Sequence, residues 1–269
     1  MINSLPKPRP IVLCPFLPSN PKRLPKRKVP MTLVAAFRCQ NGGILLCADR
    51  EEDDGYNKRE INKIYQVHGL SDCDVFIAGA GMTGPITRAC ADIDEVLHKA
   101  DAGLERKGVW LEHRGLVESS LKVLYKNYPE NMKESGGMGL LIIVAPHAEN
   151  NVPILYRTDR WMLIPESHYA AYGSGKPIAD YFAGRLFEFE RLEKAFMAIL
   201  AAFILREAQR TASGVGLGAD MVFIHEGNKS LHFAPPNAVK ELESGIPNLS
   251  DAIFSYWKDH ATAPEWVNK

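Results

Sequence analysis

The order in which strand-like and helix-like patterns follow one another constrains this chain more than any single motif. β-rich runs come first, two helical patterns follow, and strands, two further helices and a closing pair of strands complete the chain. Such segregated runs are typical of α+β folds, in which helices cover antiparallel sheets. A parallel fold would alternate strand and helix one by one. The sequence therefore predicts the α+β class.

The individual elements follow from hydrophobic periodicity and turn residues. A first hairpin is predicted to join TLVAAFRC to GILLCAD through Asn41-Gly42, which is a strong hairpin signal. Residues 50–57 are expected to form a loop, and EINKIYQV (60–67) and VFIAG (75–79) to form strands. Helices are predicted at 83–100, 116–128, 176–186 and 191–210, with strands GLLIIVAP, VPILYR, WMLI and HYAAYG between them and the hairpin DMVFIHEG–SLHFA after them. The helix at 191–210 is apolar nearly all round, which predicts a place between two layers.

Three regions are expected along the chain. Residues 1–31 read as a disordered, basic tail, because its eight prolines prevent a regular helix or a central strand. An upstream start codon chosen in error, a removable propeptide and a basic targeting patch all remain open as its explanation. Residues 32–235 form the predicted folded domain, and residues 236–269 form an irregular C-terminal extension.

Composition narrows the function classes. The chain has 32 Lys and Arg residues and 32 Asp and Glu residues, so its formal net charge is zero. The net charge therefore does not indicate nucleic acid or a membrane surface as a partner. Five cysteines without paired C-x-x-C spacing fit a reducing compartment. The eight histidines show no HxxxH spacing for a metal, and no apolar run approaches the roughly 20 residues of a membrane helix. We expect a cytoplasmic protein with no cofactor and no metal.

One motif points elsewhere. Residues 79–84 (GAGMTG) match the G-x-G-x-x-G fingerprint of dinucleotide-binding proteins, after a strand and before a helix. The second apolar strand with a terminal acidic residue, which would hold a ribose, is missing. Nucleotide binding through Gly79–Gly84 therefore stays a weak alternative.

Thr32, the first residue of the predicted domain, is the candidate catalytic nucleophile. A hydroxyl needs a nearby base, and an N-terminal threonine can use its own α-amine, whose pKa of about 7.7–8.0 suits a base near neutrality. Thr32 directly follows Met31, so removal of an initiator Met at position 31, or cleavage of a longer chain, would expose it. A neighbouring lysine would help to keep that amine neutral. Lys63 shares the parity of Ile61, Tyr65 and Val67 in an expected strand, and an inward lysine requires a carboxylate, for which Asp49 is the natural choice.

Four segments, taken in order, resemble a known family. MTLVAAFRCQNGGILLCADRE, INKIYQV, VFIAGAGMTG and YGSGKPIADYFA look like the corresponding segments of proteasome β-subunits and HslV-type peptidases. The resemblance covers about residues 31–235 and implies a four-layer α-β-β-α sandwich of two antiparallel sheets flanked by helices, the N-terminal-nucleophile (Ntn) hydrolase fold.

The resemblance also implies site residues. Thr32 matches the family's nucleophile, Asp49 the aspartate that pairs with the active-site lysine, and Lys63 that lysine. Gly79 matches the glycine whose N–H helps to form the oxyanion hole. Ser174 matches the serine that hydrogen-bonds the terminal amine.

Some positions depart from the family pattern. The further acidic residue of the long helix is assigned to Glu207, with Ser213 as the alternative if the turn ASGVGLGAD is the anchor. Aligning Thr32 as the nucleophile requires one extra residue in the first hairpin, and a different alignment would place Met31 there and leave no catalyst. The acidic loop after Asp49 leaves the substrate preference open.

The resemblance implies a threonine-type peptidase that acts through a covalent acyl-enzyme on peptides or unfolded polypeptides. It also implies self-assembly into rings or another homo-oligomer, and an unfoldase ATPase as a partner. Two further readings stay open. A blocked N-terminus would give an inactive, proteasome-like structural subunit, and the same fold also contains small-amide hydrolases.

Overall fold

The computed structural model describes residues 32–40, 42–53, 58–103, 110–128, 138–148, 151–186, 193–212, 214–216, 218–225 and 232–234, and beyond these 239–242, 244–245, 251 and 255. The tail at 1–31, Ser213 and most of the extension at 236–269 lie outside the described residues, so the predictions for them stay predictions.

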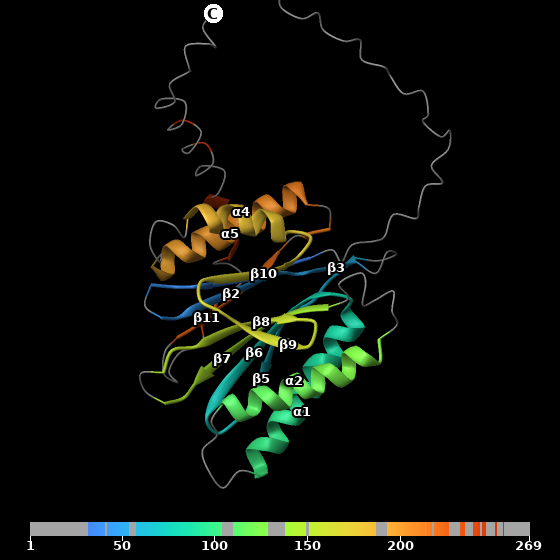
Figure 1. Ribbon diagram of the computed structural model, residues 1–269. Helices are drawn as coiled ribbons and strands as arrows, with labels where there is room; N and C mark the ends of the chain where they lie inside the picture. Colours follow the sequence, from blue (N-terminus) through green and yellow to red (C-terminus); the bar gives the residue numbers. More distant parts are fainter. Residues whose placement is uncertain are drawn as a thin grey trace, which may run out of the picture.

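Two antiparallel five-stranded sheets form the centre of the molecule (Figure 1). The first sheet has the order β10-β1-β2-β11-β12 and the second has the order β5-β6-β7-β8-β9. The strands of the first sheet are β1 (Leu33–Arg38), β2 (Ile44–Asp49), β10 (Tyr169–Gly173), β11 (Ala219–Ile224) and β12 (His232–Phe233). Those of the second are β5 (Ile64–Val67), β6 (Cys73–Gly81), β7 (Met138–Pro146), β8 (Ile154–Asp159) and β9 (Met162–Glu166).

Helices cover the outer face of each sheet (Figure 1). Helices α4 (Lys176–Leu186) and α5 (Lys194–Thr211) lie on the first sheet, and α1 (Thr83–Gly103) and α2 (Trp110–Lys126) lie on the second. Among the described helices, none is long and apolar enough to cross a membrane.

Three separate layers of buried side chains show that the arrangement has four layers. Alternation along β1 directs Leu33, Ala35 and Phe37 toward α4 and α5, and it directs Val34 and Ala36 toward the second sheet. A third cluster fills the space between the second sheet and helices α1 and α2. The α+β class and the helices on two antiparallel sheets are confirmed.

Several expected elements agree with the structure. The first hairpin closes as predicted, with Cys39 N–H donating to Gly43 O at 2.8 Å and Gly42 adopting a φ of 79°. The helix predicted at 83–100 is present as α1, and its apolar residues Ala89, Cys90 and Ile93 are buried against the second sheet. Strand β11 pairs with β12 as the closing hairpin.

Three expectations were wrong in part. Residues 50–57 are not simply a loop, because β3 (Glu51–Asp53) pairs with β4 (Lys58–Glu60). The strand expected at 60–67 begins only at Ile64, so Lys63 precedes it. Helix α5 covers one sheet from outside and leaves Phe196 60% exposed, because a helix that is apolar all round can still turn one side to the surface.

The G-x-G-x-x-G sequence at residues 79–84 does not lie in the kind of sheet that binds dinucleotides. Gly79 and Gly81 lie within β6, between the antiparallel strands β5 and β7, whereas dinucleotide-binding units are built on parallel strands. A side chain on Gly79 would come within 2.5 Å of Ile86 in α1, so this glycine permits close packing of strand and helix. The topology does not support the nucleotide-binding alternative.

Candidate active site

Thr32 immediately precedes β1, an interior strand of the first sheet, and is only 4% exposed. Its carbonyl oxygen accepts hydrogen bonds from Gly175 N–H at 3.3 Å and from the Ser174 hydroxyl at 3.4 Å. The turn after β10 therefore holds the backbone of Thr32. A Cβ on Gly173 would lie 2.0 Å from that same oxygen, and its φ of 100° also favours glycine, so this position excludes other side chains.

Asp49 is the last residue of β2 and is completely buried. Because Val34 pairs with Ala48, the register places Leu33 opposite Asp49 and brings Thr32 next to it. Oδ1 of Asp49 accepts hydrogen bonds from the Thr32 hydroxyl and, at 2.8 Å, from Leu33 N–H. Oδ2 accepts from Lys63 Nζ at 2.8 Å and from Gly216 N–H at 3.1 Å.

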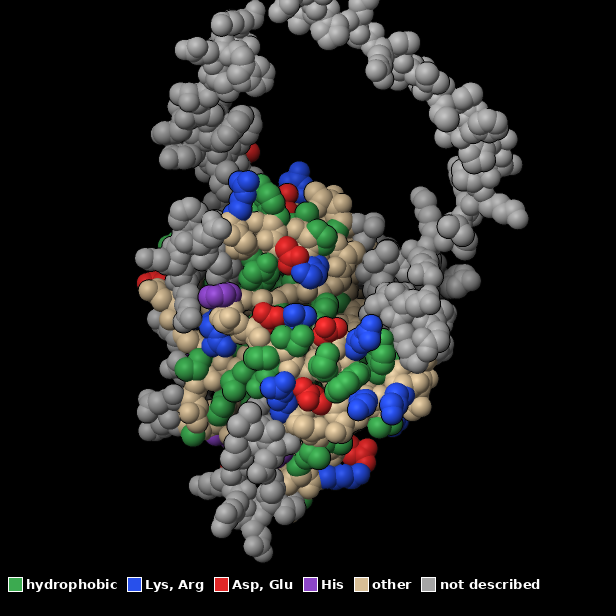
Figure 2. Space-filling view, viewed as in Figure 1, with side chains coloured by type: hydrophobic (Ala, Val, Ile, Leu, Met, Phe, Trp, Pro, Cys, Tyr) green, Lys and Arg blue, Asp and Glu red, His purple; other side chains and the backbone are tan. Residues whose placement is uncertain are grey.

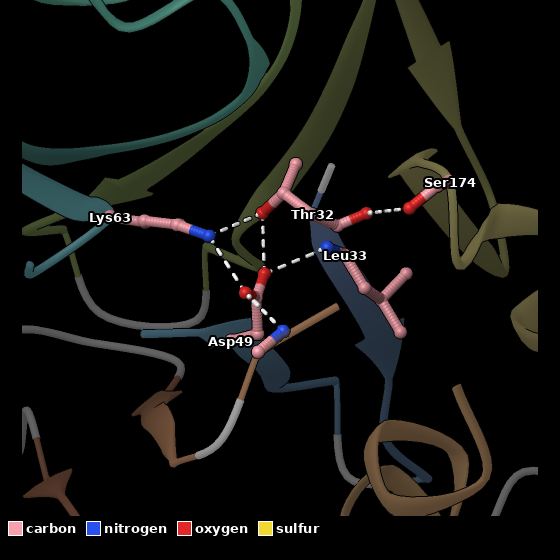
Figure 3. A network of polar contacts seen from close by, with 6 residues as sticks. Thr32, Leu33, Asp49, Lys63 and Ser174 are labelled. Carbon is pink, nitrogen blue, oxygen red and sulfur yellow. Dashed lines mark hydrogen bonds and ion pairs between the residues drawn. The ribbon is translucent and has the colours of Figure 1, made fainter. Parts of the chain in front are cut away.

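Lys63 approaches Thr32 from the side opposite to Ser174 (Figure 3). Its Nζ lies 2.6 Å from Thr32 Oγ1 as well as 2.8 Å from Asp49 Oδ2, and its side chain is 8% exposed. The hairpin β3–β4 returns the chain to this point, because Ile61 N–H donates to Arg50 O at 2.8 Å. Parity along a strand does not explain the inward lysine, since β5 has not yet begun at Lys63. The structure nevertheless pairs Lys63 with Asp49, the carboxylate chosen for it from the sequence.

The three side chains form a closed and electrically balanced cluster. One buried carboxylate meets one buried ammonium, so neither charge is left uncompensated in a site that excludes most water. The Thr32 hydroxyl donates to Asp49 and accepts from Lys63, which fixes the direction of its proton and presents a positive charge to its oxygen. An oxygen held in this way is stabilised as negative charge develops on it.

A second group of charges is centred on Arg50, the residue after Asp49. Arg50 Nε is 3.6 Å from Asp220 Oδ1, and Arg50 Nη2 is 3.8 Å from Glu60 Oε2. Burial raises the pKa of Asp220, the positive charges of Arg50 and Lys63 oppose that rise, and the negative charge of Glu60 adds to it. Lys63 is thus within electrostatic reach of a second carboxylate, although Asp49 is its ion-pair partner.

The two cysteines of the first hairpin are not reactive centres. Cys47 is fully buried in β2, and burial raises the pKa of its thiol to about 12. Cys39 is 4% exposed, and burial raises its pKa to about 11. Neither thiol would ionise appreciably near neutrality, so both act as small core residues.

The remaining predicted site residues have different placements. Ser174 does meet Thr32, but at the carbonyl oxygen, while the prediction concerned the terminal amine. Glu207 pairs with Arg210 on the same helix at 3.5 Å, and none of the contacts among the described residues links it to the cluster. Its assignment as the family's acidic residue stays a prediction without support from the geometry.

Gly79 lies opposite Leu140 in the β6–β7 ladder. Leu140 N–H donates to Thr158 Oγ1 on β8 at 2.9 Å, so the backbone of Leu140 is directed toward β8. Gly79 and Leu140 are therefore a non-hydrogen-bonded pair, and the N–H of Gly79 points away from β7. Extension of the β5–β6 register places Lys63 on that other side, opposite Gly79. Gly79 is therefore near the backbone of the cluster, and its role in an oxyanion hole stays a prediction.

Three backbone donors belong to the site and were not predicted: the N–H groups of Leu33, Gly175 and Gly216. Leu33 could have been found, since an aspartate opposite the start of β1 faces the backbone there. The turn ASGVGLGAD carried a signal for Gly216, because repeated glycines indicate a close backbone approach. No sequence pattern identifies which of its N–H groups would reach Asp49.

Comparison with known proteins gives the fold a counterpart. No family model matches the chain, and no curated protein sequence matches it. Among solved structures, Anbu from Hyphomicrobium sp. strain MC1 superposes with a TM-score of 0.62 at 15% identity, covering 87% of this chain and 100% of that chain. Anbu (ancestral beta-subunit) from Yersinia bercovieri has a TM-score of 0.61 at 13% identity, with 87% and 98% covered.

A third such structure is the helical assembly of the Anbu complex from Pseudomonas aeruginosa, with a TM-score of 0.61, 10% identity, and 87% and 98% covered. At these identities the likeness is one of fold. The chain accordingly shares its fold with Anbu.

Proposed function

We propose that this protein is a threonine-type N-terminal-nucleophile hydrolase, and specifically a peptidase, with Thr32 as its nucleophile. The observation that carries the proposal is the position of Thr32 Oγ1, which is hydrogen-bonded at once to a buried lysine and a buried aspartate. A threonine with a purely structural role at the start of a strand needs neither partner.

The reaction follows from this arrangement once the amine of Thr32 is free. The hydroxyl proton passes, through water, to that amine, and Oγ1 attacks the carbonyl carbon of the scissile amide. Lys63 stabilises the oxygen as it loses its proton, and Asp49 holds Lys63 in place. In this proposal the N–H of Gly79 receives the oxyanion.

Collapse of the tetrahedral intermediate breaks the C–N bond, and the ammonium of Thr32 returns the proton to the leaving amine. The product is an ester between Thr32 Oγ1 and the acyl part of the substrate. Water then attacks this ester, with the amine again as base, and releases the carboxylic acid and the free hydroxyl.

A free amine is the condition for activity. In the full sequence the nitrogen of Thr32 is bonded to Met31, and an amide nitrogen is not a base near neutrality. Retention of any upstream residue would therefore give a folded but inactive subunit.

The test compares two forms of the chain, one beginning at Thr32 and one beginning at Met31. Only the first should hydrolyse fluorogenic peptides, and it should gain the mass of an acyl group when the reaction is stopped early. Thr32→Ala in the first form should reduce kcat by about 10³-fold or more, because the nucleophile is lost. Intact mass of the protein from its native source identifies which form exists there.

Two results would contradict the proposal: equal peptide hydrolysis by both forms, or turnover that survives Thr32→Ala. Hydrolysis of small amides without peptide hydrolysis, when lost in Thr32→Ala, would instead assign the enzyme to the small-amide class and reject the peptidase assignment.

We also propose self-association through the outer helices. Phe196 and Ile199, three residues apart on α5, are 60% and 38% exposed, and Tyr181 on α4 is 53% exposed. Figure 2 shows hydrophobic side chains at the surface of this helical layer, among acidic and basic ones. The helical assembly named for Anbu from Pseudomonas aeruginosa supports an assembled state. An unfoldase partner stays a prediction.

A further inference from the structure

The carboxylate of Asp49 is held symmetrically. Each of its oxygens accepts one bond from a side chain of the cluster, Thr32 on Oδ1 and Lys63 on Oδ2. Each also accepts one bond from a backbone N–H, Leu33 on Oδ1 at 2.8 Å and Gly216 on Oδ2 at 3.1 Å. The two side-chain donors, Thr32 and Lys63, take part in the proposed reaction. The two backbone donors, Leu33 and Gly216, do not.

The proposed reaction changes only the side-chain donors. When Oγ1 of Thr32 becomes an ester oxygen it has no proton to donate, so Oδ1 loses that bond in the acyl-enzyme. The N–H of Leu33 stays on Oδ1, and the N–H of Gly216 stays on Oδ2. With one fixed donor on each oxygen, the carboxylate plane keeps its orientation toward Lys63 throughout the cycle.

The Gly216 donor comes from a segment that is remote in sequence. Gly216 lies in the turn between α5 and β11, 167 positions after Asp49. The same turn is fastened to the end of β2, because Arg50 N–H donates to Gly218 O at 3.2 Å and Ala219 pairs with Asp49. The β2–β11 pairing thus extends one residue beyond Asp49, to Arg50 and Gly218, and this brings the turn within reach of Asp49.

Position 216 has no space for a side chain. A Cβ there would lie 1.6 Å from Cβ of Glu51, 2.6 Å from its Cγ and 2.7 Å from its Cδ. Gly216 is not among the glycines with positive φ, so backbone conformation does not impose glycine at this position. The requirement comes from Glu51, the first residue of β3, which packs directly against the turn.

We infer that Gly216 is a positioning residue for this active site, and that its contact with Glu51 presses the turn against Asp49. The inference rests on the proposed hydrolase function for its catalytic consequence. Gly216→Ala would separate the turn from β3, withdraw one N–H from Oδ2 and release the orientation of the carboxylate. Lys63, which shares that oxygen, would lose its fixed place beside Thr32.

The contact can be tested by changing each side separately, in chains that begin at Thr32. Gly216→Ala should lower kcat about 100-fold with KM nearly unchanged, because displacement of a catalytic group by about 1 Å has that effect. Adding Glu51→Gly to Gly216→Ala removes the three closest contacts and should recover most of the lost kcat. Glu51→Ala keeps its Cβ, so the pair Glu51→Ala and Gly216→Ala should recover little.

Glu51→Gly alone measures any separate effect of losing that side chain. Gly184→Ala serves as the matched control, since a Cβ at Gly184 in α4 meets nothing within 4 Å, and it should leave kcat unchanged. Circular dichroism establishes that each variant is folded.

Amide hydrogen exchange at residue 216 gives a readout that does not depend on turnover. Residue 216 lies outside every strand and helix, so protection of its N–H reports the bond to Asp49. Protection should be present in the unmodified protein, lost in Gly216→Ala and restored when Glu51→Gly is added.

The inference is overturned if Gly216→Ala behaves like Gly184→Ala in kcat and in exchange, or if Glu51→Gly rescues no better than Glu51→Ala. An unmodified protein without hydrolase activity would refute the proposed function. In that event the exchange data alone would still decide whether Gly216 and Glu51 hold Asp49.

Discussion

At the residue scale, the site is defined by three side chains whose separate sequence signals are weak. An ordinary strand threonine, a strand-end aspartate and a strand lysine are each unremarkable in isolation, and the structure unites them within hydrogen-bonding distance. A buried lysine requires a carboxylate, and this principle paired Lys63 with Asp49, although strand parity is not the reason that Lys63 faces inward. The surrounding backbone donors depend on turn geometry, which single residues do not reveal.

Substitution of Lys63 separates its structural and chemical roles. Lys63→Met keeps most of the side-chain volume but leaves the carboxylate of Asp49 buried without its cation, so we expect a loss of about 3–5 kcal/mol in the free energy of unfolding. Lys63→Arg keeps the charge and should lose less stability. Both variants should lose most of kcat, because neither presents an ammonium group to Thr32 Oγ1.

Urea unfolding and peptide hydrolysis, measured on the same preparations, check this prediction. A Lys63→Met protein as stable as the unmodified one would show that the buried pair does not support the fold. Near-normal kcat in either variant would remove Lys63 from the mechanism.

At the element scale, the short hairpin β3–β4 determines where Lys63 lies. Local composition suggested a loop at 50–57, because the stretch is acidic and contains glycine. The observed register pairs Glu51–Asp53 with Lys58–Glu60, so the acidic stretch has a strand partner that follows it in the chain. That partner lies outside the stretch, so the pairing cannot be predicted from the composition of the acidic residues alone.

A proline at Ile61 tests the hairpin as the positioning element. The N–H of Ile61 donates to Arg50 O, and Ile61→Pro removes this donor two residues before Lys63. We expect kcat to fall by about 100-fold, since Lys63 would shift relative to Thr32. Ile61→Ala keeps the N–H and is the control, for which peptide hydrolysis should stay within a few-fold of normal. Equal activity of the two variants would show that the hairpin does not place the lysine.

All four predicted helices are present, and α4 has the predicted bounds, whereas α2 begins at Trp110, six residues before its predicted start at 116. The position of α5 was not predicted, because its apolar surface extends beyond the face that the first sheet can cover. Leu200, Ile204 and Leu205 are buried, whereas Phe196 and Ile199 remain exposed. Periodicity identifies the residues able to pack but not how many of them the neighbouring layer reaches.

At the scale of the whole molecule, the order of strands within each sheet depends on contacts between distant segments. Strand β1 pairs with β10 across about half of the chain, and β2 pairs with β11 across more than half of it. Local patterns carry no record of such partners, so the α+β class followed from the sequence while the four-layer arrangement came from family resemblance. These distant pairings bring Ser174 and Gly216 to Thr32 and Asp49.

The exposed stripe on α5 predicts the state of the whole molecule in solution. Phe196 and Ile199 lie on one side of the helix, and their burial between copies would be favourable by about 1.5–3 kcal/mol for each fully covered side chain. The full-length chain of 29.9 kDa should therefore elute as an assembly, and light scattering coupled to size exclusion should give a multiple of that mass. Phe196→Lys with Ile199→Lys should shift the mass toward one chain, because two charges cannot be buried there unpaired.

Val123→Lys, at a 61% exposed position on α2 in the opposite layer, is the matched control and should assemble normally. If the α5 variant keeps the assembled mass while Val123→Lys loses it, the interface lies on the other helical layer and the assignment to α5 is wrong.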